Sequence, residues 1–392
     1  MNLKKFVALA TCAIASHAGA ADTIKIGLLT VDSGPFTFIM RHVTEPTALA
    51  VELFNAQGGA LGRKYEIVAQ TYAGPPAAAA AAVNRLVKQE GVSFLTGFNT
   101  SSSALVLGPQ LASLNALLID SSTAADELTG KNCQANYFRV SMTDSMNMNA
   151  LRAVAKQSGA KTWDLLMPDY ATGHDFAKRF TSLVQAQGGT VQATLFAPMA
   201  TTDFGSYITQ LSTKPADALA IVFPGSTGVM LSKQQAQFGL FSKYKTVVSA
   251  FFTNDMVIDA QGDSTVGVYA ALGYKWEMPG EHNAAFVKAF EEHFKRKPTY
   301  LDADAYQSME LLNAAILKAR STDVAAVRAA LSGLKMTTVV GDVEMRAADH
   351  QLLRPIALVQ VTKAGEGKGA ITLRSVEPIA RIADPASPEC RL

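Results

Sequence analysis

The sequence predicts an α/β protein with two doubly wound lobes joined by a three-strand hinge. The chain has 392 residues, which is more than one hydrophobic core usually supports. From residue 24 onward, short apolar runs alternate with amphipathic helical segments, which is the pattern of βαβ units and parallel sheets. The apolar runs form two series, so we expect one sheet in each lobe.

Each apolar run has the length typical of a buried parallel strand. The expected strands of the first series are 24–30, 65–70, 94–97 and 117–120. Those of the second series are 162–167, 190–196, 218–223, 246–250 and 268–272. Between strands, Gly58 and Gly59 end one helix and Pro75 and Pro76 begin the next. We expect residues 22–140 and 276–338 to form the first lobe, and residues 141–275 and 339–392 to form the second.

The first twenty residues have the features of an export signal. Lys4 and Lys5 are the basic segment, residues 6–16 are apolar, and residues 18–20 form a small-residue cleavage site. We therefore interpret residues 1–20 as a signal peptide that sends the protein to the periplasm. A lipoprotein signal that uses Cys12 is the alternative, although Thr11 matches poorly in front of it.

Composition limits the classes of partner. Charged residues make up 17% of the chain and apolar residues 48%, a balance that suits a large globular core. Removing Lys4 and Lys5 with the signal takes the formal net charge from +2 to 0. Nucleic acid is therefore not an expected partner.

Two cysteines, Cys133 and Cys390, follow the signal segment. An even number of cysteines in an oxidising compartment favours one disulfide between them. The alternative is two separate buried thiols.

Small molecules bind doubly wound sheets at the loops beyond the carboxyl ends of the strands. These loops are rich in Ser, Thr, Asn, Gly and aromatic residues, which can offer hydroxyls, backbone amides and ring faces to a carboxylated ligand. The candidate loops are 31–36, 98–103, 121–124, 169–174, 224–228 and 251–255.

An ordered set of motifs resembles the branched-chain-amino-acid (Leu/Ile/Val-binding) type of ABC-transporter substrate-binding protein, with the type I periplasmic-binding fold. The motifs are Ile24-Lys25-Ile26-Gly27, Ser33-Gly34-Pro35, Asn55-Ala56-Gln57-Gly58-Gly59, Ala82-Val83-Asn84-Arg85-Leu86-Val87, Glu127-Leu128-Thr129 and Pro298-Thr299-Tyr300. The resemblance covers nearly the whole chain after the signal. It implies capture of a small ligand by lobe closure, and delivery to an ABC permease and ATPase complex by a monomeric protein.

Within that family the chain looks most like the subgroup linked to aromatic carboxylates. The matching segments are 95–98, 167–175, 223–225 and 249–251. Where amino-acid-binding relatives carry a glutamate that meets the ligand ammonium, this chain reads Phe251-Phe252-Thr253. A buried ammonium without a carboxylate partner is costly, so the loss favours an aromatic acid over an amino acid. Asp120, Asp169 or Asp255 could take the place of the glutamate, which keeps an amino-acid ligand as the alternative.

The candidate ligand-binding residues lie in these loops, and each also has an ordinary structural interpretation. Hydroxyl groups there often cap helices, and aromatic rings often only pack. The expected ligand contacts are Phe98, Asn99, Ser101, Ser122, Thr123, Tyr170, Gly225, Phe252 and Thr253.

Catalytic machinery is not visible in the sequence. Residues 225–228 read Gly-Ser-Thr-Gly, which lacks the Gly-x-Ser-x-Gly spacing of a nucleophile elbow. No phosphate-binding glycine motif and no His-Glu-x-x-His occurs, so we expect no cofactor, no metal and no enzyme activity. A ligand-sensing receptor module is the alternative from another class, because the same fold serves both roles.

Overall fold

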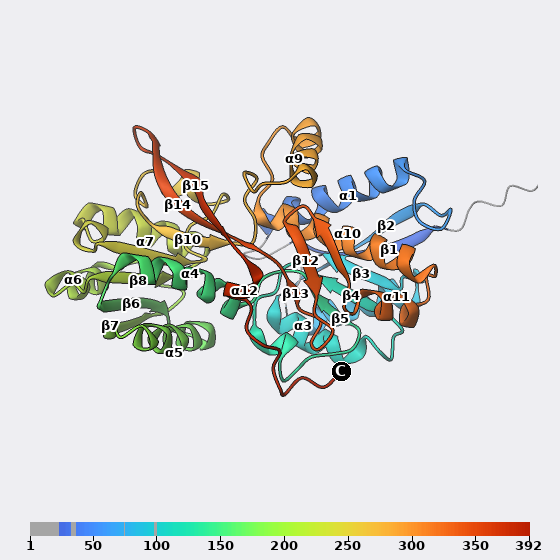
Figure 1. Ribbon diagram of the computed structural model, residues 1–392, viewed down its shortest axis with the longest axis horizontal. Coiled ribbons are helices and arrows are strands. Elements are labelled where there is room, and N and C mark those ends of the chain that lie inside the picture. The colour runs from blue at the N-terminus through green and yellow to red at the C-terminus, as the bar shows by residue number, and fades with distance from the viewer. Residues whose placement is uncertain (1–22, 33–36, 74, 98–99) are drawn as a thin grey trace, which may run out of the picture.

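The computed structural model describes residues 23–32, 37–73, 75–97 and 100–392. Two helix-covered sheets lie side by side along the long axis of the molecule (Figure 1). The predicted two-lobe α/β architecture is therefore confirmed. We call the half that contains β1 the first lobe and the half that contains β6 the second lobe.

The first lobe is built on a five-stranded parallel sheet in the order β2-β1-β3-β4-β5. Its strands are β1 (Ile24–Val31), β2 (Tyr65–Tyr72), β3 (Phe94–Gly97), β4 (Leu117–Asp120) and β5 (Tyr137–Arg139). The strand order reverses at β1, which pairs with β2 on one side and β3 on the other. Four of these strands were expected. β5 was not, because three residues are too few to give a pattern.

Helices cover both faces of the first sheet, and their apolar stripes explain where they pack. On one face lie α1 (Arg41–Ala56) and α10 (Tyr300–Ala319), with α9 (Glu281–Phe294) and α11 (Val324–Leu331) beside them. On the other lie α2 (Pro76–Lys88) and α3 (Ser101–Leu107). The alanine run of α2 is buried at Ala79 and Ala82, so small side chains let this helix lie close to the sheet.

The second lobe is built on a seven-stranded sheet in the order β15-β14-β10-β9-β8-β6-β7. Its strands are β6 (Thr162–Pro168), β7 (Thr190–Ala197), β8 (Ala218–Val222), β9 (Thr246–Ala250), β10 (Tyr269–Leu272), β14 (Ile356–Gly365) and β15 (Lys368–Glu377). All neighbours are parallel except at β10-β14 and β14-β15. The two-stranded β14-β15 extension was not expected from the sequence. It forms the long hairpin that rises from the second lobe in Figure 1.

Helices also cover both faces of the second sheet. One face carries α4 (Asp144–Ser158) and α5 (Ala171–Ala186). The other carries α6 (Gly205–Thr213), α7 (Gly225–Phe238) and the short α8 (Ile258–Gln261). A last short helix, α12 (Ile379–Ile382), packs on α4. Single 3-10 turns fill the loops at η1 (Thr37–Ile39), η2 (Gly108–Gln110), η3 (Asp126–Thr129) and η4 (Phe241–Lys243).

A small antiparallel sheet packs on the first lobe. It contains β11 (Lys335–Thr338), β12 (Gly341–Met345) and β13 (Leu352–Leu353). The backbone N–H of Val339 donates to Glu310 Oε2 of α10 at 3.2 Å. The expected boundary at 338/339 therefore falls inside the β11-β12 hairpin, and residues 339–353 lie with the first lobe rather than the second. The two strands of this hairpin are neighbours in the sequence and pair with each other, so both stay with the lobe on which β11 packs.

The chain passes between the two large sheets at three places among the described residues: after β5, after β10 and between β13 and β14. We call the segments 140–143, 273–280 and 354–355 the first, second and third crossovers. Three passages agree with the expected three-strand hinge. Because each is short, the lobes can rotate about them without unfolding.

Candidate ligand-binding site

In the first lobe, the loops after β3 and β4 are tied to each other. Ser101 begins α3, and its Oγ accepts hydrogen bonds from the backbone N–H groups of Ala124 at 3.4 Å and Ala125 at 3.3 Å. Thr100 is the N-cap of the same helix and accepts from the Ser103 N–H at 3.1 Å. The hydroxyl of Ser101 thus fixes the neighbouring loop, and the side chains of Ser101 and Ser122 remain half-buried.

The buried carboxylate of Asp120 binds the backbone of the loop after β4. Asp120 Oδ1 accepts from the N–H of Ser122 at 2.9 Å and of Thr123 at 3.3 Å. Burial raises the pKa of Asp120 to about 6, although the hydrogen bond from Ser122 and the charge of Arg139 oppose the shift. Thr123 is also buried, and its Oγ1 lies 2.8 Å from the Tyr137 hydroxyl. Thr123 therefore supports the loop in this conformation and, unlike the expectation, has no open face for a ligand.

In the second lobe, Tyr170 is the exposed aromatic residue of the loop after β6. It is the N-cap of α5, and 39% of its surface is accessible. Beside it, His174 Nε2 lies 2.8 Å from Asp169 Oδ1. Gly225 begins α7 with φ +63°, a left-handed conformation that favours glycine. The loop after β6 thus presents an exposed aromatic ring, and the loop after β8 ends at the N-terminus of α7.

The loop after β9 turns its two phenylalanines in opposite directions. Phe251 has φ +58° and stays half-buried, whereas Phe252 has no accessible surface. The ring of Phe252 lies 6.1 Å from that of Phe241 in an edge contact within the core. Thr253 is 1% exposed and donates to Gln261 Oε1 at 2.8 Å.

The expectation that Phe252 and Thr253 face the ligand does not fit this conformation. A side chain with no accessible surface has no face to offer. The left-handed backbone at Phe251 is the physical reason, because it turns the next residue inward. Phe251 is the partly exposed phenylalanine of this loop. The pattern of apolar residues along β9 does not predict that the residue after the strand has a left-handed backbone conformation.

A buried ion pair at the second crossover was also missed. Lys275 Nζ donates to Asp255 Oδ1 at 2.8 Å and lies 3.5 Å from Glu277 Oε2. Lys275 is 4% exposed, so its buried positive charge needs these carboxylates for compensation. Asp255 Oδ2 is buried without a hydrogen-bond partner in the described part of the chain. A lone lysine in the sequence carries no signal of such a pair.

The same loop contacts the opposite lobe. Met256 packs against the apolar cluster formed by Ile39, Val43 and Leu301 of the first lobe. The loop after β9 therefore links the second lobe to the first beside the crossovers. Phe98 and Asn99, two of the expected ligand contacts, lie outside the described residues.

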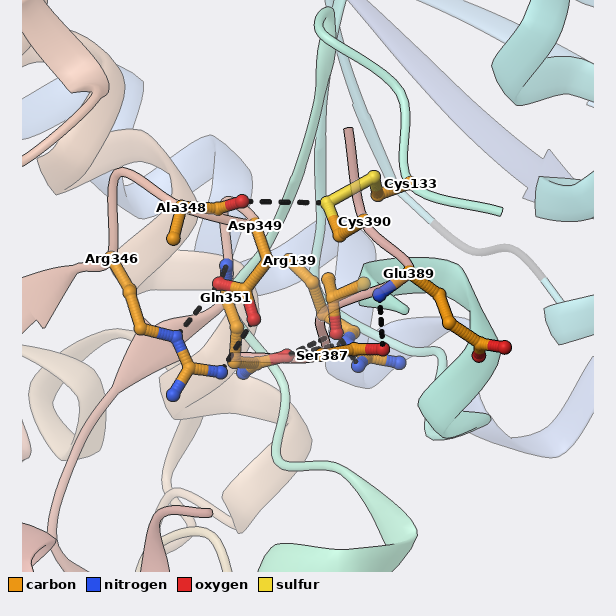
Figure 2. Close-up of a disulfide and its surroundings, with 10 residues drawn as sticks. Cys133, Arg139, Arg346, Ala348, Asp349, Gln351, Ser387, Glu389 and Cys390 are labelled. Atoms are coloured by element: carbon orange, nitrogen blue, oxygen red, sulfur yellow. Dashed lines mark hydrogen bonds and ion pairs between the residues drawn. A yellow bond between two sulfur atoms is a disulfide. The ribbon is translucent and has the colours of Figure 1, made fainter. Parts of the chain in front are cut away.

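The two cysteines are bonded to each other, as predicted. Cys133 lies after η3 in the first lobe, Cys390 lies in the C-terminal segment, and their Cα atoms are 5.5 Å apart. Figure 2 shows the disulfide beside the buried Arg139, Gln351 and Asp349 side chains. Arg139 Nε donates to Gln351 Oε1 at 2.6 Å.

The described ranges contain no cluster of three or more His, Cys, Asp or Glu side chains that could hold a metal ion. In the same ranges, no helix is both long and apolar enough to cross a bilayer.

Two α/β lobes, three short crossovers and polar and aromatic loops at the strand ends define a two-lobed small-molecule binding protein. The chain belongs to the periplasmic binding protein family, whose model matches residues 23–366. A Leu/Ile/Val-binding protein homologue of Brucella melitensis is 24% identical over 371 residues, covering 92% of this chain and 93% of the relative.

Solved structures with similarly low sequence identity share the fold. A solute-binding protein of an ABC transporter from Rhodopseudomonas palustris BisB5, in complex with 3,4-dihydroxybenzoic acid, is 23% identical with a TM-score of 0.79, covering 93% of this chain and 99% of that one. A branched-chain amino acid ABC transporter ligand-binding protein from Burkholderia xenovorans LB400 is 23% identical with a TM-score of 0.82, covering 93% and 97%. The predicted family is confirmed.

Proposed function

We propose that this protein is the periplasmic solute-binding component of an ABC uptake transporter and that it captures a small aromatic carboxylate between its lobes. Ligand contacts from both lobes stabilise the closed form, and an ABC permease and ATPase complex receives the ligand from that form. The protein acts as a monomer. The family membership and the site geometry support this proposal.

One observation carries the choice of ligand. The loop after β9 has phenylalanines where the resemblance to amino-acid-binding proteins implies a glutamate. Two of the three possible substitutes for this glutamate are engaged elsewhere. Asp120 is buried under its own loop, and Asp169 pairs with His174. A ligand ammonium near Asp120 or Asp169 would therefore lack a carboxylate partner. Burying an unpaired ammonium would cost about 3 kcal/mol or more.

Groups suited to an aromatic acid are present instead. Tyr170 and Phe251 are at least partly exposed in the second lobe, and Ser101 and Ser122 are partly exposed in the first. Burying a ring of roughly 150 Å² contributes about 4 kcal/mol at 25 cal/mol per Å², before the cost of association. Hydroxyls and backbone amides would hold the carboxylate by charge-assisted hydrogen bonds.

An amino-acid ligand is the second candidate, and one specific observation favours it. Asp255 Oδ2 is buried without a hydrogen-bond partner in the described residues, so it has capacity to accept a hydrogen bond from an ammonium. The similarity to Leu/Ile/Val-binding protein homologues points the same way. However, Lys275 already neutralises this carboxylate, which weakens its attraction for a second cation.

A thermal-shift screen tests the proposal as a whole. A ligand that binds only the folded protein raises the melting temperature by mass action. We expect benzoates or cinnamates to shift the melting temperature more than branched-chain or acidic amino acids at equal concentration. The proposal fails if no small carboxylate stabilises the protein.

A further inference from the structure

The C-terminal segment leaves the second lobe from a firmly held position. Ile382 of α12 has no accessible surface and belongs to the core between α4, α5 and the sheet. Asn149 Nδ2 of α4 donates to the Ile382 carbonyl at 3.0 Å and to Asp384 Oδ1 at 2.9 Å. Arg152 Nη2 donates to the Arg381 carbonyl at 2.7 Å. The chain is thus fixed to the second lobe up to Asp384.

Six residues later the same segment is covalently fixed to the first lobe. Cys390 is bonded to Cys133, which follows η3 (Figure 2). Cys390 Sγ also lies 3.4 Å from the carbonyl of Ala348, in the loop between β12 and β13. At the Asp384 end, Arg346 Nη1, which follows β12, donates to the Asp384 carbonyl at 2.6 Å. Residues 384–390 therefore connect the lobes, and in Figure 1 they run below the crossovers to the C-terminus.

This connection is short and stiff. Six residues span at most about 20 Å when fully extended. Pro385 and Pro388 fix two of the backbone φ angles and reduce the freedom of the segment further. Its length therefore sets an upper limit to the separation of its two ends.

The segment borders space that lies between the lobes. A cavity of about 680 Å³ is lined by η3, by the start of α4, by Asp175, Phe176 and Arg179 of α5, and by residues of the C-terminal segment. Across it, Arg179 Nη2 of α5 lies 3.2 Å from Asp126 Oδ2 of η3, and Ser145 Oγ donates to the same oxygen at 2.7 Å. These contacts join the lobes beside the segment, and they would have to break if the lobes separated on this side.

We propose that residues 384–390, closed by the Cys133–Cys390 disulfide, form a strap that limits how far the lobes separate. The strap is a fourth link beside the three crossovers. It narrows the range of open conformations, so less conformational freedom is lost on closure. Only its effect on ligand affinity rests on the proposed function. The limit on opening does not.

Small-angle scattering of the ligand-free mature protein tests the strap with three variants. Cys133→Ser/Cys390→Ser removes the covalent link. An eight-residue Gly/Ser insertion after Ala386 keeps the disulfide but lengthens the strap. The same insertion between Glu366 and Gly367, in the β14-β15 turn, is the matched control. Thiol titration of the unfolded insertion variants verifies that the disulfide is intact.

We expect the double serine variant and the Ala386 insertion to raise the radius of gyration by about 1 Å above a compact value of about 21 Å, and the control insertion to leave it unchanged. Unchanged radii in both test variants would overturn the strap. A rise on disulfide removal alone would also overturn it, because the disulfide would then stabilise its own surroundings rather than limit opening. Thermal-shift responses of the same variants to benzoate report separately on the proposed function.

Discussion

Arg354 on the third crossover donates a hydrogen bond from Nη2 to the carbonyl of Gly273 on the second crossover at 2.6 Å. Its Nη1 donates to the carbonyl of Val140 on the first crossover at 3.2 Å and also pairs with Asp304 of α10. The arginine has no accessible surface. One buried guanidinium therefore joins all three crossovers to a helix of the first lobe, at the place where the lobes must bend.

Replacing this arginine should destabilise the protein strongly. Arg354→Met leaves the Asp304 carboxyl buried without its cation, and removing one partner of a buried ion pair costs about 3–5 kcal/mol. The double variant Arg354→Met/Asp304→Leu should cost less than the single one, because no buried charge remains. Urea unfolding measures both, with Arg374→Met on the exposed face of β15 as the control. A loss for Arg354→Met no greater than that of the control would contradict the role given to this residue.

The buried His350 should make the free energy of unfolding depend on pH. His350 stacks on Phe138 with ring centroids 3.9 Å apart, and burial lowers its pKa from 6.5 to about 4. Between pH 6.5 and about 4, His350 is therefore protonated in the unfolded chain but neutral in the folded protein. The free energy of unfolding falls as the pH drops through this range. The loss from this residue alone is about 3 kcal/mol.

The variant His350→Asn should remove this part of the pH dependence. Asparagine tolerates the left-handed φ of +56° at this position. Unfolding free energies at pH 7, 5 and 4 should converge between variant and wild type as the pH falls. The exposed His174→Asn, measured at the same pH values, is the control for replacing a histidine outside the core. Parallel profiles for His350→Asn and wild type would rule out this account of His350.

Two aromatic residues of the candidate site should behave differently on truncation. Tyr170→Ala removes an exposed ring and should weaken the binding of an aromatic acid about tenfold while leaving the melting temperature nearly unchanged. Phe252→Ala empties a core position and should cost about 3–5 kcal/mol of stability. Calorimetric titration and thermal unfolding of both variants check this. An unchanged affinity in Tyr170→Ala would remove that ring from the site.

The strands and loops that carry the site were predictable because burial on both faces leaves a strong local pattern. The strand β9 was expected with the bounds that the structure shows, Thr246–Ala250, since its residues are short or apolar and β-branched in a continuous run. The hairpin of β14 and β15 escaped prediction because its outer half is exposed, with Lys363 and Glu366 near its turn. Half-exposed strands give a weaker signal than buried ones.

Side-chain direction inside the loops was less predictable. Phe251 and Phe252 are chemically identical in the sequence, and only the backbone conformation at Phe251 decides which ring enters the core. Long-range partners were equally hidden. Asp255 and Lys275 are twenty residues apart and meet only because β10 lies beside β9 in the sheet. The disulfide was predictable because compartment and cysteine count restrict the pairing.

The proposed cleft between the lobes should take an aromatic monocarboxylate in preference to an amino acid. Isothermal titration calorimetry of ligand-stripped mature protein tests it with benzoate, 4-hydroxybenzoate, leucine and glutamate. We expect saturable binding of at least one aromatic acid with a negative heat-capacity change. Both amino acids should bind more weakly by about 100-fold or more, because Lys275 already neutralises Asp255 and an ammonium would meet no unpaired negative charge there. Tight binding of leucine with no heat from either aromatic acid would contradict the claim.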